Sequence, residues 1–245
     1  MFSFAELGGK PPAVKFSVMS FQTIAQNILG REPTPNEGIS EQVIRQQEER
    51  LKVKFPAPLL EFYASVGNLN LFIKGYQRFV RLEDLRVKDG KLVFLAEHQE
   101  VVHWAVDLTN GKAVYQTTDQ CLDGQVAWHK EAFDLRHFLE AMLFLQCVMA
   151  DDAMHSQTQG GYAFFASLSA NEYHQNAKFR LYIEVVEQQS TIIAHGNGLA
   201  IFWQQGTILL YFINSQGMPE EMLLVCTKDE VLFDELIDRC GFAQL

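Results

Sequence analysis

Cysteine is scarce in this chain of 245 residues, and its spacing excludes two classes of protein. The four cysteines are Cys121, Cys147, Cys226 and Cys240, with no Cys-x-x-Cys pair among them. This density is too low for a disulfide scaffold, and the spacing does not fit a zinc site. Proline and glycine, at 7 and 16 residues, are also not enriched, and 48% of the chain is hydrophobic. A globular protein with a packed core is therefore expected, and a disordered or collagen-like chain is excluded.

Long apolar runs are missing as well. No stretch of about 18 uncharged apolar residues exists, so the sequence predicts no membrane span. Residues 1–6 (MFSFAE) lack the basic start and continuous apolar stretch of a signal peptide. The expected location is the cytoplasm.

Positive charge is in deficit, with 20 Lys and Arg against 30 Asp and Glu, a net charge of −10. Binding to phosphate backbones needs concentrated Lys and Arg, so the composition argues against direct nucleic-acid binding. Residues 1–150 hold 16 basic and 18 acidic residues, whereas residues 151–245 hold 4 and 12. The C-terminal charge either faces a basic partner or keeps an apolar segment soluble.

Motifs for catalysis or metal binding are not found. The chain has no Gly-x-Ser-x-Gly elbow, no phosphate-binding Gly-x-x-x-x-Gly-Lys loop and no His-Glu-x-x-His. His98 and His103 are five apart, which suits neither one helix face nor one strand face for a shared metal. His195 and His129 are interpreted as structural. A catalytic triad assembled from distant residues stays possible because triads are geometric. The sequence predicts no catalytic residue, no cofactor and no metal.

Apolar spacing and capping residues predict five helices. Ser20 and Ser40 start the first two, Pro58 lies in the first turn of the third, Asp134 caps the fourth, and Thr227 caps the last with Glu230 three residues on. The fourth helix is apolar on most sides, so it is expected to be buried. The predicted helices span residues 20–29, 40–53, 58–66, 135–149 and the stretch from about 228 to 240.

Strands are predicted where β-branched and aromatic residues gather between turn signals. Asp89-Gly90, Asn110-Gly111 and Asn197-Gly198 favour antiparallel hairpins because these pairs tolerate positive φ angles. The predicted strands span residues 71–82, 91–96, 101–108, 112–116, 126–129, 179–187, 191–195, 200–203, 208–213 and 222–226.

The order of elements predicts an α+β fold with a mainly antiparallel, twisted sheet flanked by helices. Residues 151–160 are polar and without periodicity, which favours a boundary there. The predicted parts are an α+β domain over residues 1–150 and an acidic, strand-rich extension over 151–245 that ends in a helix. Packing of the extension on the first part is expected, because about 90 residues with few helices bury both faces of a sheet poorly.

Residues 49–63 (ERLKVKFPAPLLEFY), followed by Gly67-Asn68, resemble the opening of the SUKH superfamily. Residues 79–85 (FVRLEDL) and 94–99 (FLAEHQ), then Trp104, are similar to the strand region of that family, and Trp128 and the helix over 135–145 match its tail. The resemblance covers residues 38–150. Gly67-Asn68 reverses the usual order, His98 stands where Asn is expected, and Glu100 stands where Gly is expected.

The resemblance implies a protein-binding module and not an enzyme. Bacterial members of the family are immunity proteins that neutralise a cognate toxin, often a nuclease, and fungal members regulate cell-wall synthesis. An acidic inhibitor would be steered toward a basic toxin domain. The expected contact residues are Glu184, Glu187, Glu220 and Glu221. The alternatives are a regulatory scaffold that binds a cellular partner, or an enzyme whose signature would be a pocket of converging ionisable groups.

Overall fold

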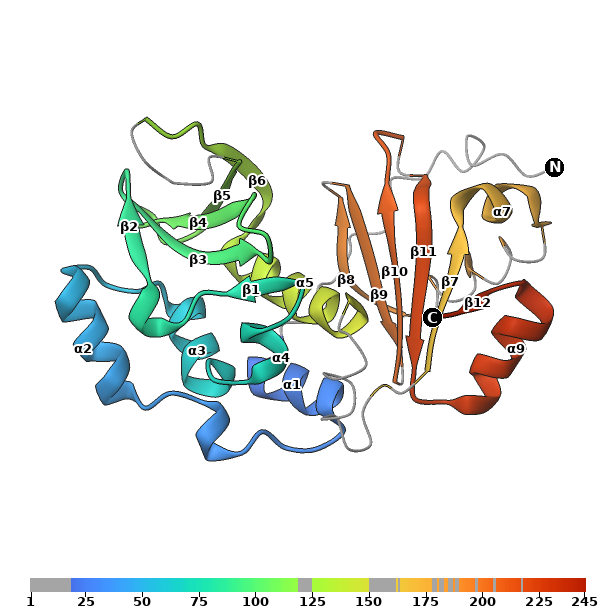
Figure 1. Cartoon of the computed structure of the whole chain (residues 1–245), viewed down its shortest axis with the longest axis horizontal. Coiled ribbons are helices and arrows are strands. Elements are labelled where there is room, and N and C mark those ends of the chain that lie inside the picture. Colours follow the sequence, from blue (N-terminus) through green and yellow to red (C-terminus); the bar gives the residue numbers. More distant parts are fainter. Residues whose placement is uncertain are drawn as a thin grey trace.

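The α+β class is confirmed: the computed structural model contains seven described helices and two antiparallel sheets (Figure 1). No helix in the described part of the chain is long and apolar enough to cross a membrane. The structure describes residues 19–118, 125–149, 162, 164–177, 180, 183–184, 187, 190–196, 198–204, 206–216 and 218–245. The expected boundary at 151–160, the N-terminal residues 1–6, and Asn197 of the third predicted turn lie outside these ranges.

The first region of the molecule, residues 19–149, places its helices on one side of a six-stranded sheet, called sheet A here. Two 3₁₀ turns, Pro35–Glu37 (η1) and Leu82–Asp84 (η2), join its elements. The helices are α1 (Phe21–Leu29), α2 (Glu41–Leu51), α3 (Ala57–Val66), α4 (Asn70–Ile73) and α5 (Leu135–Met149). The strands are β1 (Gln77–Phe79), β2 (Arg86–Lys88), β3 (Lys91–Glu97), β4 (His103–Asp107), β5 (Ala113–Thr117) and β6 (His129–Asp134).

Local signals set several of these elements. The side chain of Ser20 accepts a hydrogen bond from the backbone N–H of Thr23 at the start of α1, and Asp134 accepts from the N–H of His137 at the start of α5. Both caps were predicted. Asp89 and Gly90, with φ angles of 50° and 71°, close the β2–β3 hairpin as expected.

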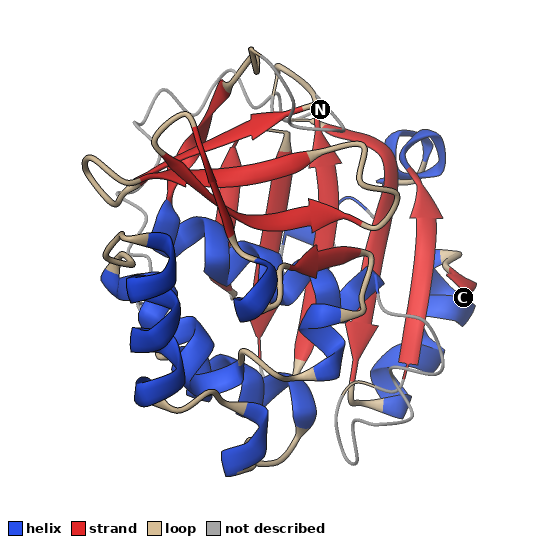
Figure 2. Cartoon of the chain, turned by 60° about the vertical axis from the view of Figure 1, so that its left-hand side comes forward, coloured by secondary structure: helices blue, strands red, loops and turns tan. Residues whose placement is uncertain are grey.

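Sheet A runs in the order β1-β3-β4-β5-β6, with β2 also paired to β3. Figure 2 shows these strands above the helices, with no helix drawn on their other side. Strand alternation then separates two faces. Trp104 and Val106 belong to the core shared with the helices, whereas Ala105 packs with Val93 and Val126 on the outer face.

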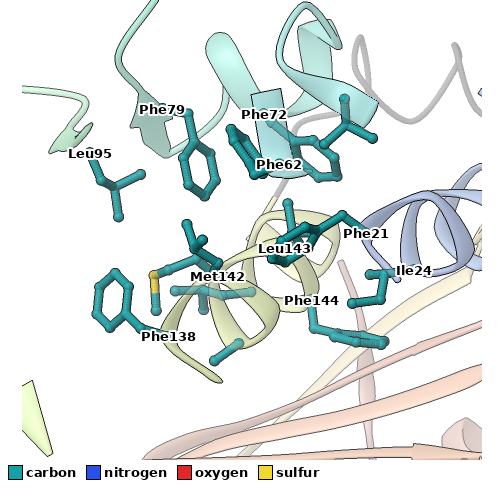
Figure 3. Packing of buried hydrophobic residues seen from close by; sticks show 14 of the residues in the cluster. Phe21, Ile24, Phe62, Phe72, Phe79, Leu95, Phe138, Met142, Leu143 and Phe144 are labelled. Atoms are coloured by element: carbon teal, nitrogen blue, oxygen red, sulfur yellow. The ribbon is translucent and has the colours of Figure 1, made fainter. Parts of the chain in front are cut away.

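Helix α5 is the centre of the molecule and is buried on nearly all sides, as predicted. Figure 3 shows Phe138, Met142 and Leu143 of α5 facing Phe62, Phe79 and other aromatic side chains of the first region. Phe144 points toward the second sheet, and its ring lies 6.3 Å from that of Trp203.

The second region, residues 162–245, is built on another six-stranded sheet, called sheet B here, in the order β12-β7-β11-β10-β9-β8. The strands are β7 (Phe164–Ser169), β8 (Thr191–Gly196), β9 (Leu199–Gln204), β10 (Thr207–Ile213), β11 (Pro219–Thr227) and β12 (Ala243–Gln244). The helices are α7 (Ala170–Gln175) and α9 (Glu230–Cys240).

Both faces of sheet B are covered. Ile208 and Leu210 of β10 join the core around α5, while Leu209 and Tyr211 alternate to a second core that includes Phe233 and Leu236 of α9. Helix α5 contacts β8, β9, β10 and β11 (Figure 1). Burial on both faces explains why the sequence of β10, TILLYFI, is almost continuously apolar. The cores of the two regions therefore meet at α5.

Three predicted strands are wrong in type or position. Within the predicted strand 179–187, Arg180, Ile183, Glu184 and Glu187 are helical. β-Branched residues predict strands only weakly, and here packing of Ile183 into the second core of sheet B takes precedence. Within 71–82, the structure has α4, β1 and the turn η2 in place of one strand. The strand predicted at 126–129 is displaced along the chain: β6 begins at His129, and Val126 packs with Val93 on the outer face of sheet A.

The second region was also predicted incompletely, at its end and at its beginning. Thr227 does not cap α9: the carboxylate of Asp229 accepts from the N–H groups of Val231 and Leu232, and the Thr227 hydroxyl accepts from the N–H of Asp229. Strand β7 and helix α7 were not predicted. A capping box between Ser169 and Glu172 starts α7, a pattern that is readable in the sequence as Ser-x-x-Glu.

Candidate functional site

The four predicted contact glutamates do not share one surface. Glu187 is half-buried, and its Oε1 accepts a hydrogen bond of 2.5 Å from the hydroxyl of Tyr211. Burial raises the pKa of Glu187, and the nearby charge of Glu184 raises it further. Because Tyr211 belongs to the core on the α9 side of sheet B, these two glutamates lie on that side.

Glu220 lies on the opposite face. It is paired across the strands with Phe212, which follows Tyr211 and therefore points away from the α9 side. Glu221 has a φ angle of 61° within the bulge that shifts the β10–β11 register. Both Glu220 and Glu221 are exposed.

Two large apolar side chains are exposed beside Glu220. Phe212 is 37% exposed and Met222 is 43% exposed. Met222 pairs with Ser169, and its neighbour Leu223 pairs with Leu168 in the α9-side core, so Met222 faces the same way as Phe212. We call Phe212, Glu220, Glu221 and Met222 the β10–β11 patch. The two glutamates are among the predicted contact residues, whereas the apolar pair is not, because the exposure of an apolar side chain cannot be read from its residue type.

The histidine cluster that was weighed as a metal site is separated by the fold. His98 is exposed and stacks on Tyr76 with ring centroids 6.0 Å apart, whereas His103 is buried in β4. Among the residues that the structure describes, no group of three or more His, Cys, Asp and Glu is arranged to hold a metal ion.

The residues shared with the resemblance have clear structural contacts. The indole N–H of Trp104 donates to Glu131 at 2.9 Å inside the core, and that of Trp128 donates to Asp89 at 3.3 Å near the surface. Glu97 accepts from the backbone N–H groups of Gln99 and Val101, so its carboxylate holds the β3–β4 loop.

A cavity of about 380 Å³ opens on the outer face of sheet A. Arg78, Ala96 and His103 are consecutive cross-strand partners on β1, β3 and β4, so their side chains share this face. The small side chain of Ala96 leaves space between its larger neighbours. The other residues that line the cavity are Ile73, Phe79, Val80, Arg81, Asp84, Arg86, Glu97 and Glu100.

His103 is the most buried ionisable group of this cavity, with 1% of its surface exposed. Its Nε2 lies 3.4 Å from Nη2 of Arg86, and its Nδ1 has no hydrogen-bond partner among the described residues. Burial lowers the pKa of His103, and the charge of Arg86 lowers it further, against an opposing effect of Glu100. Both effects favour the neutral form of the imidazole.

The chain was compared with known proteins in three ways. No protein-family model matches the chain, and neither the search of curated proteins nor the search of solved structures returns a significant match.

Proposed function

We propose that the chain is a protein-binding module that docks a basic partner through the β10–β11 patch and catalyses no reaction. The observation on which this depends is the exposure of Phe212 and Met222 on one face, with Glu220 beside them. Exposed apolar side chains grouped with charged ones are typical of interaction surfaces, whereas single exposed apolar residues need no explanation.

Charge supports a basic partner. Residues 151–245 contain 12 acidic and 4 basic residues, so the region that presents the patch has an excess of negative charge. Long-range attraction would speed the encounter with a positively charged surface, and the apolar pair would then supply contact area that excludes water.

The resemblance of residues 38–150 to the SUKH superfamily favours one such partner, a toxin domain that the protein neutralises. A nuclease toxin has a basic groove for its phosphate substrate, and an acidic patch that occupied this groove would block that substrate. Binding of a cellular partner by a regulatory scaffold is the alternative outcome of the experiment.

The test uses the full chain and the polypeptides encoded by the genes on either side of its own. Affinity is measured by calorimetry at low and high salt, and neutralisation is measured as growth of cells that express the chain with each of these polypeptides. We expect tight binding and rescue by the wild-type protein, with at least a tenfold weaker affinity for Phe212→Ser/Met222→Ser and for Glu220→Lys/Glu221→Lys.

Two control variants match these changes elsewhere on the surface. Val231→Ser alters an exposed apolar residue of α9, and Glu32→Lys/Glu49→Lys reverses two exposed charges in the first region. Binding that is unaffected by the patch variants would move the interface elsewhere. Failure of the wild-type protein to bind or rescue would exclude toxin neutralisation and leave the scaffold alternative.

A further inference from the structure

The outer face of sheet A holds a site that the proposed function does not use. The cavity described above lies in the first region, whereas the β10–β11 patch lies in the second. Its lining includes three arginines, from β1, from the connection to η2 and from β2. The cavity volume of about 380 Å³ lies within the range of small-molecule sites in proteins.

The arginines of the cavity keep their charge available. Within the described parts of the first region, no carboxylate forms an ion pair with Arg78, Arg81 or Arg86. Glu97 also lines the cavity, but its carboxylate is engaged by the backbone of the β3–β4 loop. Asp84 and Glu100 remain as opposing charges at the cavity.

The hydrogen bonding of His103 gives an independent indication that the cavity binds a ligand. A guanidinium group only donates hydrogen bonds, so Nε2 of His103 accepts from Arg86. A neutral imidazole that accepts at Nε2 has its proton on Nδ1. This Nδ1–H is a buried donor with no acceptor among the described residues. Leaving such a donor unsatisfied is costly, and an oxygen of a ligand that reached it from the cavity would satisfy it.

We infer that this cavity binds a small molecule through an oxyanionic group, a phosphate or a carboxylate. The planar fork of arginine matches both groups through paired N–H···O bonds, and three arginines can engage one such group from several sides. His103 contributes a neutral N–H donor and so adds a hydrogen bond without adding charge. Ala96 leaves room for the ligand on the sheet between Arg78 and His103.

Glu100 provides a way to distinguish an anionic ligand from a cationic one. As a carboxylate at the cavity, it repels an oxyanion but would attract a cation. Removing its charge should therefore strengthen binding of an anion and weaken binding of a cation. The same variant distinguishes the two ligand classes by the sign of its effect.

The experiment is calorimetric titration of the full-length protein with pyrophosphate and, separately, with citrate. We expect saturable binding of at least one probe, weakened at least tenfold by Arg78→Gln and by Arg81→Gln and strengthened severalfold by Glu100→Gln. The probe that binds more tightly identifies phosphate or carboxylate as the preferred group. Arg45→Gln, which removes one exposed arginine of α2, should leave binding unchanged.

A second measurement places the probe in the cavity. The long-range ¹H–¹⁵N signal of the His103 ring should shift on addition of pyrophosphate or citrate, and in Arg78→Gln the same shift should need at least tenfold more probe. Because Arg78 and Arg81 are exposed, their substitution should leave the fold intact, which circular dichroism checks. The inference is overturned if neither probe binds at millimolar concentration, if Arg45→Gln weakens binding as much as Arg78→Gln, or if Glu100→Gln weakens it.

Discussion

The two sheets differ in what covers them, and this difference indicates where function is to be sought. Sheet B is enclosed between α5 on one face and α7 and α9 on the other. In the described part of the chain, sheet A is packed against helices on one face only, and its other face holds the cavity with its arginines. Strands covered on both faces have little freedom to vary, whereas an open face can accommodate polar side chains. In sheet B, polar and exposed apolar residues accordingly gather at strand ends, as in the β10–β11 patch.

Because the two cores meet at α5, both sheets are expected to unfold as one cooperative unit. A substitution at Phe144 tests this expectation and has the largest expected effect. Phe144→Ala leaves a void between α5 and sheet B and should lower the free energy of unfolding by about 4 kcal/mol. Urea unfolding of protein labelled with 5-fluorotryptophan reports sheet A through Trp104 and Trp128 and sheet B through Trp203. We expect all three ¹⁹F signals to change together at a lower urea midpoint.

The control for this experiment is Val231→Ala, at a residue that is 71% exposed on α9. It should change the midpoint little. Loss of the Trp203 signal at lower urea than the Trp104 signal would show two cooperative units.

A smaller effect is expected from an ionic cluster that lies entirely in the first region. Arg136 of α5 pairs with Glu61 of α3 and, at 2.7 Å, with the buried Glu140. Its guanidinium also lies 4.1 Å from the ring of Phe21, and burial raises the pKa of Glu140. Arg136→Met leaves the Glu140 carboxylate buried without its partner, so we expect a loss of about 3 kcal/mol of stability in urea unfolding.

Arg45→Met is a matched control, because Arg45 forms an ion pair of the same i,i+4 class with Glu41, but at the surface. That pair should contribute less than about 0.5 kcal/mol. Replacing both members of the buried pair, Arg136→Met/Glu140→Leu, should recover part of the loss. Equal effects of Arg136→Met and Arg45→Met would contradict the assigned role of burial.

The smallest effect concerns acid, again within the first region. Arg31 and the backbone of Thr34 lower the pKa of Glu37 from 4.5 to about 2. The folded state thus holds this carboxylate ionised more strongly than the unfolded state does. Its contribution to stability is fully present above about pH 5 and is lost as the pH falls from about 4.5 toward 2.

Glu37→Gln should therefore destabilise the protein at pH 7 and much less at pH 2.5, as measured by urea unfolding at both pH values. Glu49→Gln, on the exposed side of α2, serves as the control with little effect at either pH. A destabilisation by Glu37→Gln of the same size at both pH values would show that charge is not the cause.

Features set by neighbours in the sequence were predictable. The caps Ser20 and Asp134, the Asp89-Gly90 turn and the apolar periodicity of α5 each depend on a few adjacent residues, and the α+β class followed from them. The helical residues between 180 and 187 were not predictable in this way, because Ile183 is positioned by the distant core of sheet B. The cap at Asp229 was missed because Thr227 offered an equally plausible hydroxyl two residues earlier.

The cavity could not be predicted from the sequence, for a different reason. Arg78, Ala96 and His103 face one another only because of the register of three strands, and a slip of one residue would turn each side chain to the other face. No spacing along the chain encodes this register. The pairing of Phe212 with Glu220 likewise depends on the bulge in the β10–β11 pair, which no local sequence motif predicts.

The contact between α5 and β11 contains a pair of thiols whose position has a practical consequence. The sulfur atoms of Cys147 and Cys226 lie 3.9 Å apart, both buried, and burial raises the pKa of Cys226. A buried, protonated thiol reacts with an alkylating reagent only when the surrounding structure opens. The rate at which these two sulfurs are labelled in the native protein, without denaturant, therefore reports how frequently α5 and sheet B separate.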